Sequence, residues 1–103
     1  MVKYESKVVT HDIIIIGAGV AGCATALELA NQGARIQLID QGGLGQESSW
    51  AGGGILYPLL PWDYAEAVNH LVQRSIALFP SWAEKLHAAS GIDPEYRKCG
   101  MLV

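Results

Sequence analysis

The sequence predicts an α/β fold that begins with one βαβ unit and continues into helices. Three observations support this fold class. Residues 8–16 are rich in β-branched side chains and end in four isoleucines, residues 17–22 are rich in glycine, and residues 34–40 form a second apolar run that ends in an acidic residue. A strand, a helix and a parallel strand within about 30 residues make one βαβ unit, whose crossover is expected to be right-handed.

The elements of this unit follow from composition and spacing. Residues 8–16 predict a strand that is buried on both faces, as in a parallel sheet. Residues 23–32 are rich in alanine and leucine and predict a helix, which is apolar on nearly every side and is therefore expected to be buried. Gly33 suits the C-terminal cap of this helix. Residues 34–40 alternate apolar and polar side chains, which predicts the second strand.

The middle of the chain predicts a loop and then an amphipathic helix. Residues 41–62 contain glycine runs and two prolines and are expected to form the loop. The helix is predicted over residues 63–78. Its apolar face is expected to consist of Val68, Leu71, Val72, Ser75 and Leu78.

The last part of the chain predicts a second helix and the start of further strands. Pro80 suits the first turn of a helix over residues 80–90, and Gly91 suits its end. Residues 95–103 indicate strand structure that begins near the end of the sequence. Three aromatic side chains are expected to form a core between the two helices, namely Trp62, Phe79 and Trp82.

Composition narrows the function classes. The chain has 103 residues, a net charge of −3 and no basic stripe, so nucleic acid is not expected as a partner. Cys23 and Cys99 match no metal or redox spacing, which favours a reduced cytoplasmic protein. The uncharged run over residues 13–27 is shorter than the ~18 residues of a membrane span, and the N-terminus is too polar for a signal peptide. Neither a membrane partner nor a metal is expected, and the three histidines are isolated.

The glycine motif carries the main functional signal. Its residues are Gly17, Ala18, Gly19, Val20, Ala21 and Gly22, which fit Gly-x-Gly-x-x-Gly between a predicted strand and a predicted helix. Gly17 permits the tight turn, Gly19 leaves room for a diphosphate, and Gly22 allows close packing of helix and strand. Asp40, at the end of the second strand, is placed to accept hydrogen bonds from ribose hydroxyls and disfavours a 2′-phosphate. The motif predicts a Rossmann-like dinucleotide site but leaves NAD and FAD open.

The stretches "DIIIIGAGVAGCATALELANQGARIQLID" and "SSWAGGGILYPLLPW" together resemble the D-amino-acid oxidase family of FAD-dependent oxidoreductases. The resemblance covers nearly the whole chain and is greatest to the members that oxidise glycine in the synthesis of the thiazole of thiamine. It implies FAD as the cofactor. It also implies an oxidase that deaminates glycine or another small amino acid with oxygen, giving an imine or 2-oxo acid and hydrogen peroxide. A homo-oligomer is expected for the full-length enzyme.

The resemblance also implies how the second glycine-rich stretch is used. Ser48 and Ser49 are expected near the pyrophosphate and ribityl chain, and Ile55 beside the flavin ring at the edge of the substrate site. Trp50 departs from the small residue of some relatives and is expected to be a partly buried packing aromatic. The complete set of predicted cofactor contacts is Gly17, Ala18, Gly19, Val20, Ala21, Gly22, Asp40, Gln41, Ser48, Ser49, Ala51, Gly52, Gly53, Gly54 and Ile55.

The expected domain organisation is that of an N-terminal fragment. Residues 1–60 are predicted to start the FAD-binding domain, and residues 61–103 to form a helical segment and the first strands of a substrate-domain insertion. No catalytic residue is predicted within the chain, because the resemblance places the groups that grip the substrate carboxylate beyond it. Two alternatives stay open. One is an FAD-dependent dehydrogenase of a D-amino acid, sarcosine or glycerol 3-phosphate, and the other is a non-catalytic nucleotide-binding module.

Overall fold

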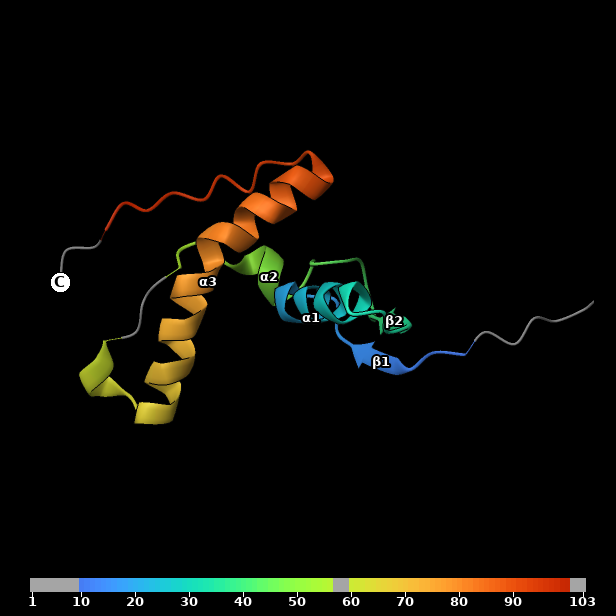
Figure 1. The fold of residues 1–103 in the computed structure, drawn as a ribbon, viewed down its shortest axis with the longest axis horizontal. Helices are drawn as coiled ribbons and strands as arrows, with labels where there is room; N and C mark the ends of the chain where they lie inside the picture. Colours follow the sequence, from blue (N-terminus) through green and yellow to red (C-terminus); the bar gives the residue numbers. More distant parts are fainter. Residues whose placement is uncertain (1–9, 57–59, 101–103) are drawn as a thin grey trace, which may run out of the picture. The chain divides into compact units, whose positions relative to one another are not determined.

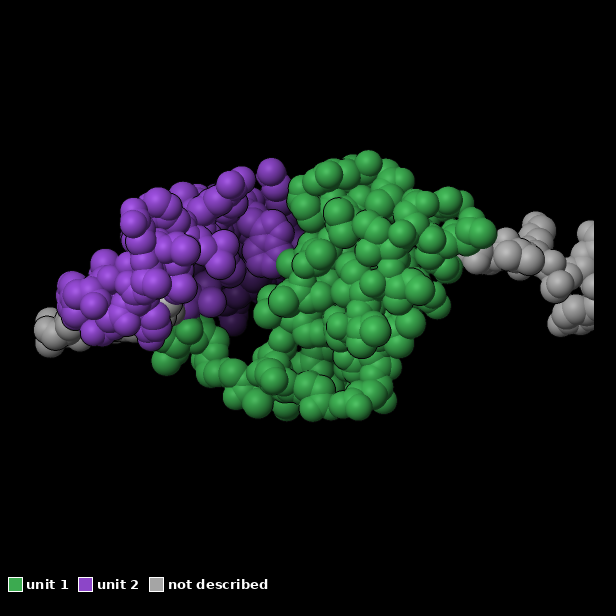
Figure 2. Space-filling view, turned by 90° about the horizontal axis from the view of Figure 1, so that it is seen from below, with its two compact units in different colours: residues 1–55 green, residues 56–103 purple. Residues whose placement is uncertain are grey.

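A computed structural model describes residues 10–56 and 60–100 of the chain. The chain divides into two compact units, residues 1–55 and residues 56–103 (Figure 2). The elements of each unit are labelled in Figure 1. Within the described ranges, no helix is both long and apolar enough to cross a membrane.

The first unit contains the predicted βαβ arrangement. Strand β1 (Ile13–Ile16) pairs in parallel with strand β2 (Ile36–Ile39), in a register that places Ile13 opposite Ile36. Helix α1 (Val20–Asn31) connects them and contacts both strands. The helix ends as expected at Gly33, whose φ of 92° suits a residue without a side chain and whose N–H donates to the Ala30 carbonyl. The α/β fold class is therefore confirmed.

An exposed ion pair at the start of the two strands is consistent with their register. The Arg35 carbonyl accepts the N–H of Asp12 at 2.9 Å, and the Arg35 N–H donates to the Asp12 carboxylate at 2.9 Å. The guanidinium binds the same carboxylate through Nη2 at 2.9 Å and also donates to the Thr10 hydroxyl. The hydrogen bonds from Arg35 lower the pKa of Asp12 to about 2. Both ends of this contact belong to residues that enter the strands, so a register slip would break it.

The burial predicted for this unit is wrong. Among its described residues only Ala18 is buried, and α1 has no buried residue. Ile14 is 58% exposed and Ile16 is 86% exposed, although their β-branched side chains were expected to be covered on both faces. The reason is geometric: the described sheet has two strands and one helix packed on it, which leaves the other face and both edges open to solvent.

The loop predicted over residues 41–62 contains two short helical turns. Helix α2 covers Ser48–Ala51, and a 3₁₀ turn, η1, covers Pro61–Asp63. Gly52 follows α2 in an extended conformation. The loop prediction missed α2 because three glycines directly follow its four residues and weigh against a helix.

The second unit is built on one long helix and not on the two that were predicted. Helix α3 runs from Glu66 to Ser90 and contains Pro80. Figure 1 shows it changing direction about midway along its length. Proline removes one N–H donor and crowds the preceding turn, so it bends a helix whose hydrogen bonds continue on both sides. The end is as predicted, since Gly91 has a φ of 72° and donates its N–H to the His87 carbonyl at 2.9 Å.

The apolar face predicted for this helix is largely exposed. Leu71 is 67% exposed and Leu78 is 55% exposed, and Ala83 is the only buried residue of α3. The described residues 92–100 contain no strand, so the strand expectation for residues 95–100 is wrong, while residues 101–103 lie outside the described part. With no strand packed on it, the apolar face has no partner layer among residues 60–100.

An aromatic cluster covers part of α3. The Phe79 and Trp82 rings lie 5.5 Å apart in an edge-to-face arrangement, and Phe79 also contacts Tyr96, which lies beyond the helix, at 5.2 Å. Trp62 was expected in this cluster but is 75% exposed. The prediction for Trp62 assumed two packed helices, whereas the single helix leaves η1 without that neighbour.

Candidate functional site

The glycine-rich turn links β1 to α1 and depends on two glycines for its shape. Gly17 has a φ of 104°, and its N–H donates to the Ile39 carbonyl at 2.7 Å, which ties the turn to β2. A Cβ placed on Gly22 would lie 1.8 Å from the Gly17 carbonyl oxygen. The first turn of α1 therefore packs directly on the main chain of the glycine-rich turn, as the motif predicts.

The N-terminus of α1 is contacted by the second glycine-rich stretch. Gly19 is the N-cap residue and has no side chain to accept the first helical N–H groups. The hydroxyl oxygen of Ser49, from α2, accepts the Val20 N–H at 2.8 Å. A Cβ on Gly19 would lie 3.0 Å from the same oxygen. Two segments that are 29 residues apart in sequence thus meet at one helix N-terminus, where a phosphate is favoured.

Asp40 closes the other side of the turn. Its Oδ2 accepts the Ala18 N–H at 2.8 Å, and its Oδ1 accepts the Gly42 N–H at 2.8 Å. These two donors lower the pKa of the Asp40 carboxyl, first through Ala18 and then through Gly42. A half-buried, ionised carboxylate therefore lies beside the turn, at the end of β2.

The segment between Asp40 and α2 folds back onto the turn. The Gly45 N–H donates to the Ala18 carbonyl at 2.8 Å. Gln41, a predicted contact residue, directs its amide to Glu47 at 3.5 Å, and among the described residues no hydrogen bond joins its side chain to the turn. Gly42 and Gly45 were not predicted as site residues. The signal that points to them is the acidic residue followed by a glycine-rich stretch, which brings main-chain N–H groups within reach of Asp40 and Ala18.

The residues predicted to contact the flavin ring follow α2 and are open to solvent. Gly52 follows α2, and a Cβ on Gly53 or Gly54 would meet no atom within 4 Å, so the main chain there is open to a neighbouring group. Ile55 is 80% exposed. Among the described residues, no hydrogen bond joins residues 52–55 to the turn. Trp50 was expected to be partly buried but is 80% exposed, because α2 directs Ser49 to the turn and leaves the indole in solvent.

The residues present fit the diphosphate end of a dinucleotide. The N–H groups of Ala21 and Gly22, in the first helical turn, have no acceptor among the described residues. A Cβ on Gly19 would meet only Ser49 Oγ within 4 Å, so the missing side chain leaves space beside the helix N-terminus. Main-chain N–H groups at a helix N-terminus, next to a hydroxyl and a carboxylate for ribose, match the chemistry of a nucleotide diphosphate.

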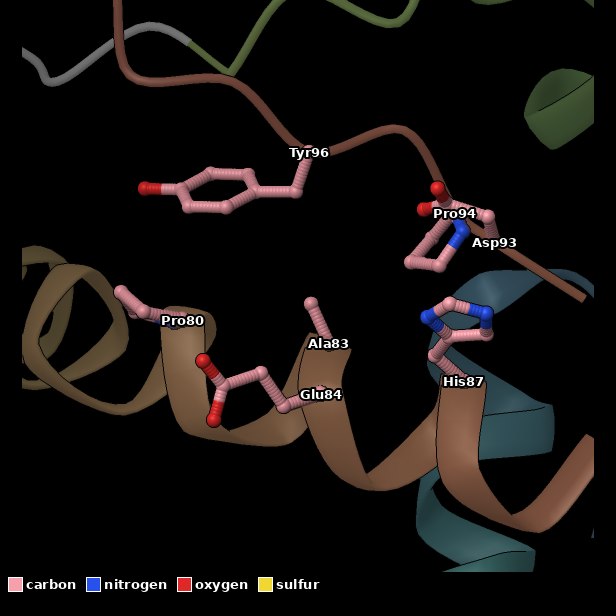
Figure 3. A pocket seen from close by; sticks show the side chains of 7 residues that line it. All are labelled: Pro80, Ala83, Glu84, His87, Asp93, Pro94 and Tyr96. Atoms are coloured by element: carbon pink, nitrogen blue, oxygen red, sulfur yellow. The ribbon is translucent and has the colours of Figure 1, made fainter.

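Two hollows lie elsewhere. One of about 370 Å³, in the first unit, is lined by Leu44, Gln46 and Trp50. The other, of about 250 Å³, lies in the second unit between α3 and the segment that follows it. Figure 3 shows the Tyr96 ring above the stretch of helix between Pro80 and Ala83, with Glu84 and His87 on the helix side. Neither hollow includes residues 17–22, and no group of three metal-ligating side chains occurs in the described ranges.

Comparison with known proteins identifies a matching family and similar relatives. The family model described as "FAD dependent oxidoreductase", DAO, matches residues 12–103. The chain is 42% identical over 92 residues to a glycine oxidase of Pseudomonas putida, covering 89% of this chain and 25% of that protein. It is 44% identical over 89 residues to a glycine oxidase of Pseudomonas aeruginosa, covering 86% of this chain and 24% of that protein. It is 36% identical over 93 residues to a bifunctional protein ThiO/ThiG of Trichormus variabilis, covering 90% of this chain and 14% of that protein.

A solved structure agrees with these matches. A crystal structure of glycine oxidase from Bacillus cereus superimposes with a TM-score of 0.76 at 30% identity, over 85% of this chain and 24% of that one. The chain therefore spans about a quarter of the length of the glycine oxidases that it matches. The resemblance noted from the sequence is confirmed. The chain belongs to the DAO family of FAD-dependent oxidoreductases and is similar to the N-terminal part of glycine oxidases.

Proposed function

We propose that this chain is the nucleotide-binding part of an FAD-dependent oxidase of glycine or another small amino acid. The observation that carries the proposal is the contact between Ser49 and the N-terminus of α1, at 2.8 Å, which brings both glycine-rich segments to one phosphate-binding position. The names of the relatives support glycine as the substrate. The products are an imine or 2-oxo acid and hydrogen peroxide.

Each segment has a distinct task in this proposal. The N–H groups of Ala21 and Gly22 donate to the diphosphate, and Gly19 leaves it room to approach. Asp40 accepts hydrogen bonds from the ribose hydroxyls through lone pairs that its two main-chain donors leave free. Ser49 accepts from Val20 and so retains its own O–H to donate to a phosphate oxygen.

The stretch from Gly52 to Ile55 serves the flavin end. Main chain without side chains at Gly53 and Gly54 lets a flat ring approach closely. Ile55 extends an apolar side chain toward the edge of that ring. When bound, the flavin would supply the acceptor for a hydride from the substrate α-carbon, and this stretch of the chain would position it. Ala51, Ser48 and Gln41 complete the proposed contact set, with Gln41 the least supported by the geometry.

The runner-up is an FAD-dependent dehydrogenase of another amine or a polyol. The observation in its favour is that the matching family is described only as FAD-dependent oxidoreductases, which specifies neither the substrate nor the acceptor. A non-catalytic nucleotide-binding module is the third reading. It predicts nucleotide binding without turnover.

Purification of the protein at its natural length separates these readings. The oxidase predicts flavin absorbance and hydrogen peroxide release with glycine that exceeds release with sarcosine, D-alanine and glycerol 3-phosphate. Turnover with a dye acceptor but without peroxide would favour the dehydrogenase, and bound nucleotide without turnover would favour the module. A colourless protein that binds no FAD would overturn the proposal. The same preparation tests the proposed homo-oligomer by size-exclusion chromatography, and cell fractionation tests the proposed cytoplasmic location.

A further inference from the structure

We propose that Asp40 is a positioning residue that forms the glycine-rich turn before any nucleotide binds, in addition to its contact with ribose. The inference rests on the proposed function, because the turn is the proposed diphosphate site. It goes further in assigning the carboxylate a task that does not require the ribose.

The geometry centres on Ala18. This residue is fully buried in the middle of the turn, and its N–H has Asp40 Oδ2 as its acceptor at 2.8 Å. Its carbonyl accepts the Gly45 N–H at 2.8 Å, and the Cys23 thiol donates to the same oxygen at 3.5 Å. Both polar groups of Ala18 are therefore satisfied by residues outside the turn. The contact with Asp40 joins residues 22 positions apart.

The chemistry requires a carboxylate at this place. Asp40 accepts one N–H on each oxygen, from Ala18 and from Gly42, and an ionised carboxylate has acceptors only. An asparagine has one acceptor oxygen and an NH₂ group, so it can satisfy only one of the two N–H groups and turns a donor toward the other. Even where the amide oxygen keeps the buried Ala18 N–H, that N–H loses its charged acceptor, and a hydrogen bond to a charged group is roughly twice as strong as one to a neutral group. Asp40→Asn therefore loosens the turn even though its size is unchanged.

The first experiment removes the ribose hydroxyls from the ligand. Calorimetry measures the binding of ADP and of 2′,3′-dideoxy-ADP to the nucleotide-free protein at its natural length. Asp40→Asn is compared with the wild type and with Asp63→Asn, a matched change at an exposed carboxylate in the second unit. Positioning predicts that Asp40→Asn weakens both ligands by about tenfold or more. It also predicts that Asp40→Glu, which keeps an acceptor-only carboxylate, recovers part of the dideoxy-ADP affinity. A loss confined to ADP would overturn the proposal.

The second experiment needs no ligand. Amide hydrogen exchange of Ala18 in the nucleotide-free protein is expected to be about tenfold faster in Asp40→Asn than in Asp63→Asn, because the N–H has lost its charged acceptor. Equal exchange rates would overturn the proposal. If the wild type binds neither nucleotide, the proposed function fails, while the exchange rates still decide whether Asp40 positions the turn.

Discussion

The hydrogen bonds within the two units differ in how far apart in sequence their partners lie. In the first unit, hydrogen bonds join Ala18 to Asp40, Val20 to Ser49 and Arg35 to Asp12, which are 22, 29 and 23 positions apart. In the described part of the second unit, no hydrogen bond spans more than the eight positions between Asn69 and Pro61. Long-range polar contacts specify one arrangement of distant segments, whereas the second unit depends on the local pattern of a single helix.

This difference explains at which positions a single substitution is expected to destabilise the protein. In the first unit the proposed functional surface is the main chain itself, so a glycine or an acceptor there is required by the main-chain atoms that it contacts. In α3 most of the large aliphatic side chains are exposed, so a helical pattern tolerates their exchange. Its one buried residue, Ala83, is the position that does not tolerate a larger side chain.

The contrast can be stated for single positions. Gly22 is fixed by a main-chain carbonyl five positions earlier, and no side chain fits there. Leu71 and Leu78, on the exposed face of α3, are more than half exposed and are expected to accept conservative replacement within this unit. The predictions below test this contrast, beginning with the largest expected effect.

Gly22→Ala is expected to have the largest effect. The added Cβ would lie 1.8 Å from the Gly17 carbonyl oxygen, so α1 must move away from the turn. The expected loss is about 3 kcal/mol of unfolding free energy, measured by urea denaturation. Gly53→Ala is the matched control, because a Cβ there meets no atom within 4 Å. Equal stability of the two variants would remove the close packing of helix and turn from this account.

Pro80→Ala tests the second unit in the opposite direction. Alanine restores a donor for the helical hydrogen bond that proline cannot make, so α3 should straighten and the protein should gain about 2 kcal/mol. Thermal unfolding and the helical circular dichroism signal check both effects. Ser81→Ala is the control at the next position. A loss of stability in Pro80→Ala would mean that the bend itself is needed for packing.

Ser49→Ala tests the contact between the two glycine-rich stretches. The Val20 N–H loses its acceptor at 2.8 Å, and the expected cost is about 1 kcal/mol, as for a helix cap. Ser49→Thr keeps the hydroxyl and should restore most of the stability, and Ser48→Ala controls for a serine next to it in α2. If Ser48→Ala and Ser49→Ala have equal effects on the urea midpoint, the cap is not what holds α2 to the turn.

The smallest effect is expected at the ion pair between Asp12 and Arg35, because it is exposed. The pKa of Asp12 is lowered from 3.8 to about 2, so the ion pair stabilises the folded protein fully above pH 3.8. This contribution is lost as the pH falls through about 2. Asp12→Asn should therefore flatten the fall in stability between these two pH values, measured by thermal unfolding. Asp63→Asn, as the control, should leave the slope of the wild type, and an unchanged slope in Asp12→Asn would contradict the assignment.

Much of the first unit could be predicted from the sequence, because its glycines report backbone geometry directly. The motif of residues 17–22 predicts the turn, the helix N-terminus and the close packing at Gly22, and the structure contains all three. The hydrogen bond between the Asp40 carboxylate and the Ala18 N–H could not be predicted. An acidic residue at the end of a strand indicates a ribose partner, but its hydrogen bond to Ala18 depends on the path of the chain between them.

The second unit was harder to predict, because its signals are local and one of them was ambiguous. Pro80 is compatible with the first turn of a new helix and with a bend in a continuous one. The structure has the continuous helix. The Phe79 and Trp82 rings, which precede and follow the proline in sequence, pack against each other. Burial could not be predicted in either unit, because it depends on which other elements cover an apolar face and not on that face alone.

The central claim is that both glycine-rich segments contact one flavin dinucleotide. The most direct test is to follow backbone amide chemical shifts of the protein at its natural length as FAD is added. The account predicts large shifts at Gly19 to Gly22 and, in the same titration, at Ser49 and Gly52 to Gly54. Shifts confined to one of the two segments, or absent from both, would contradict it.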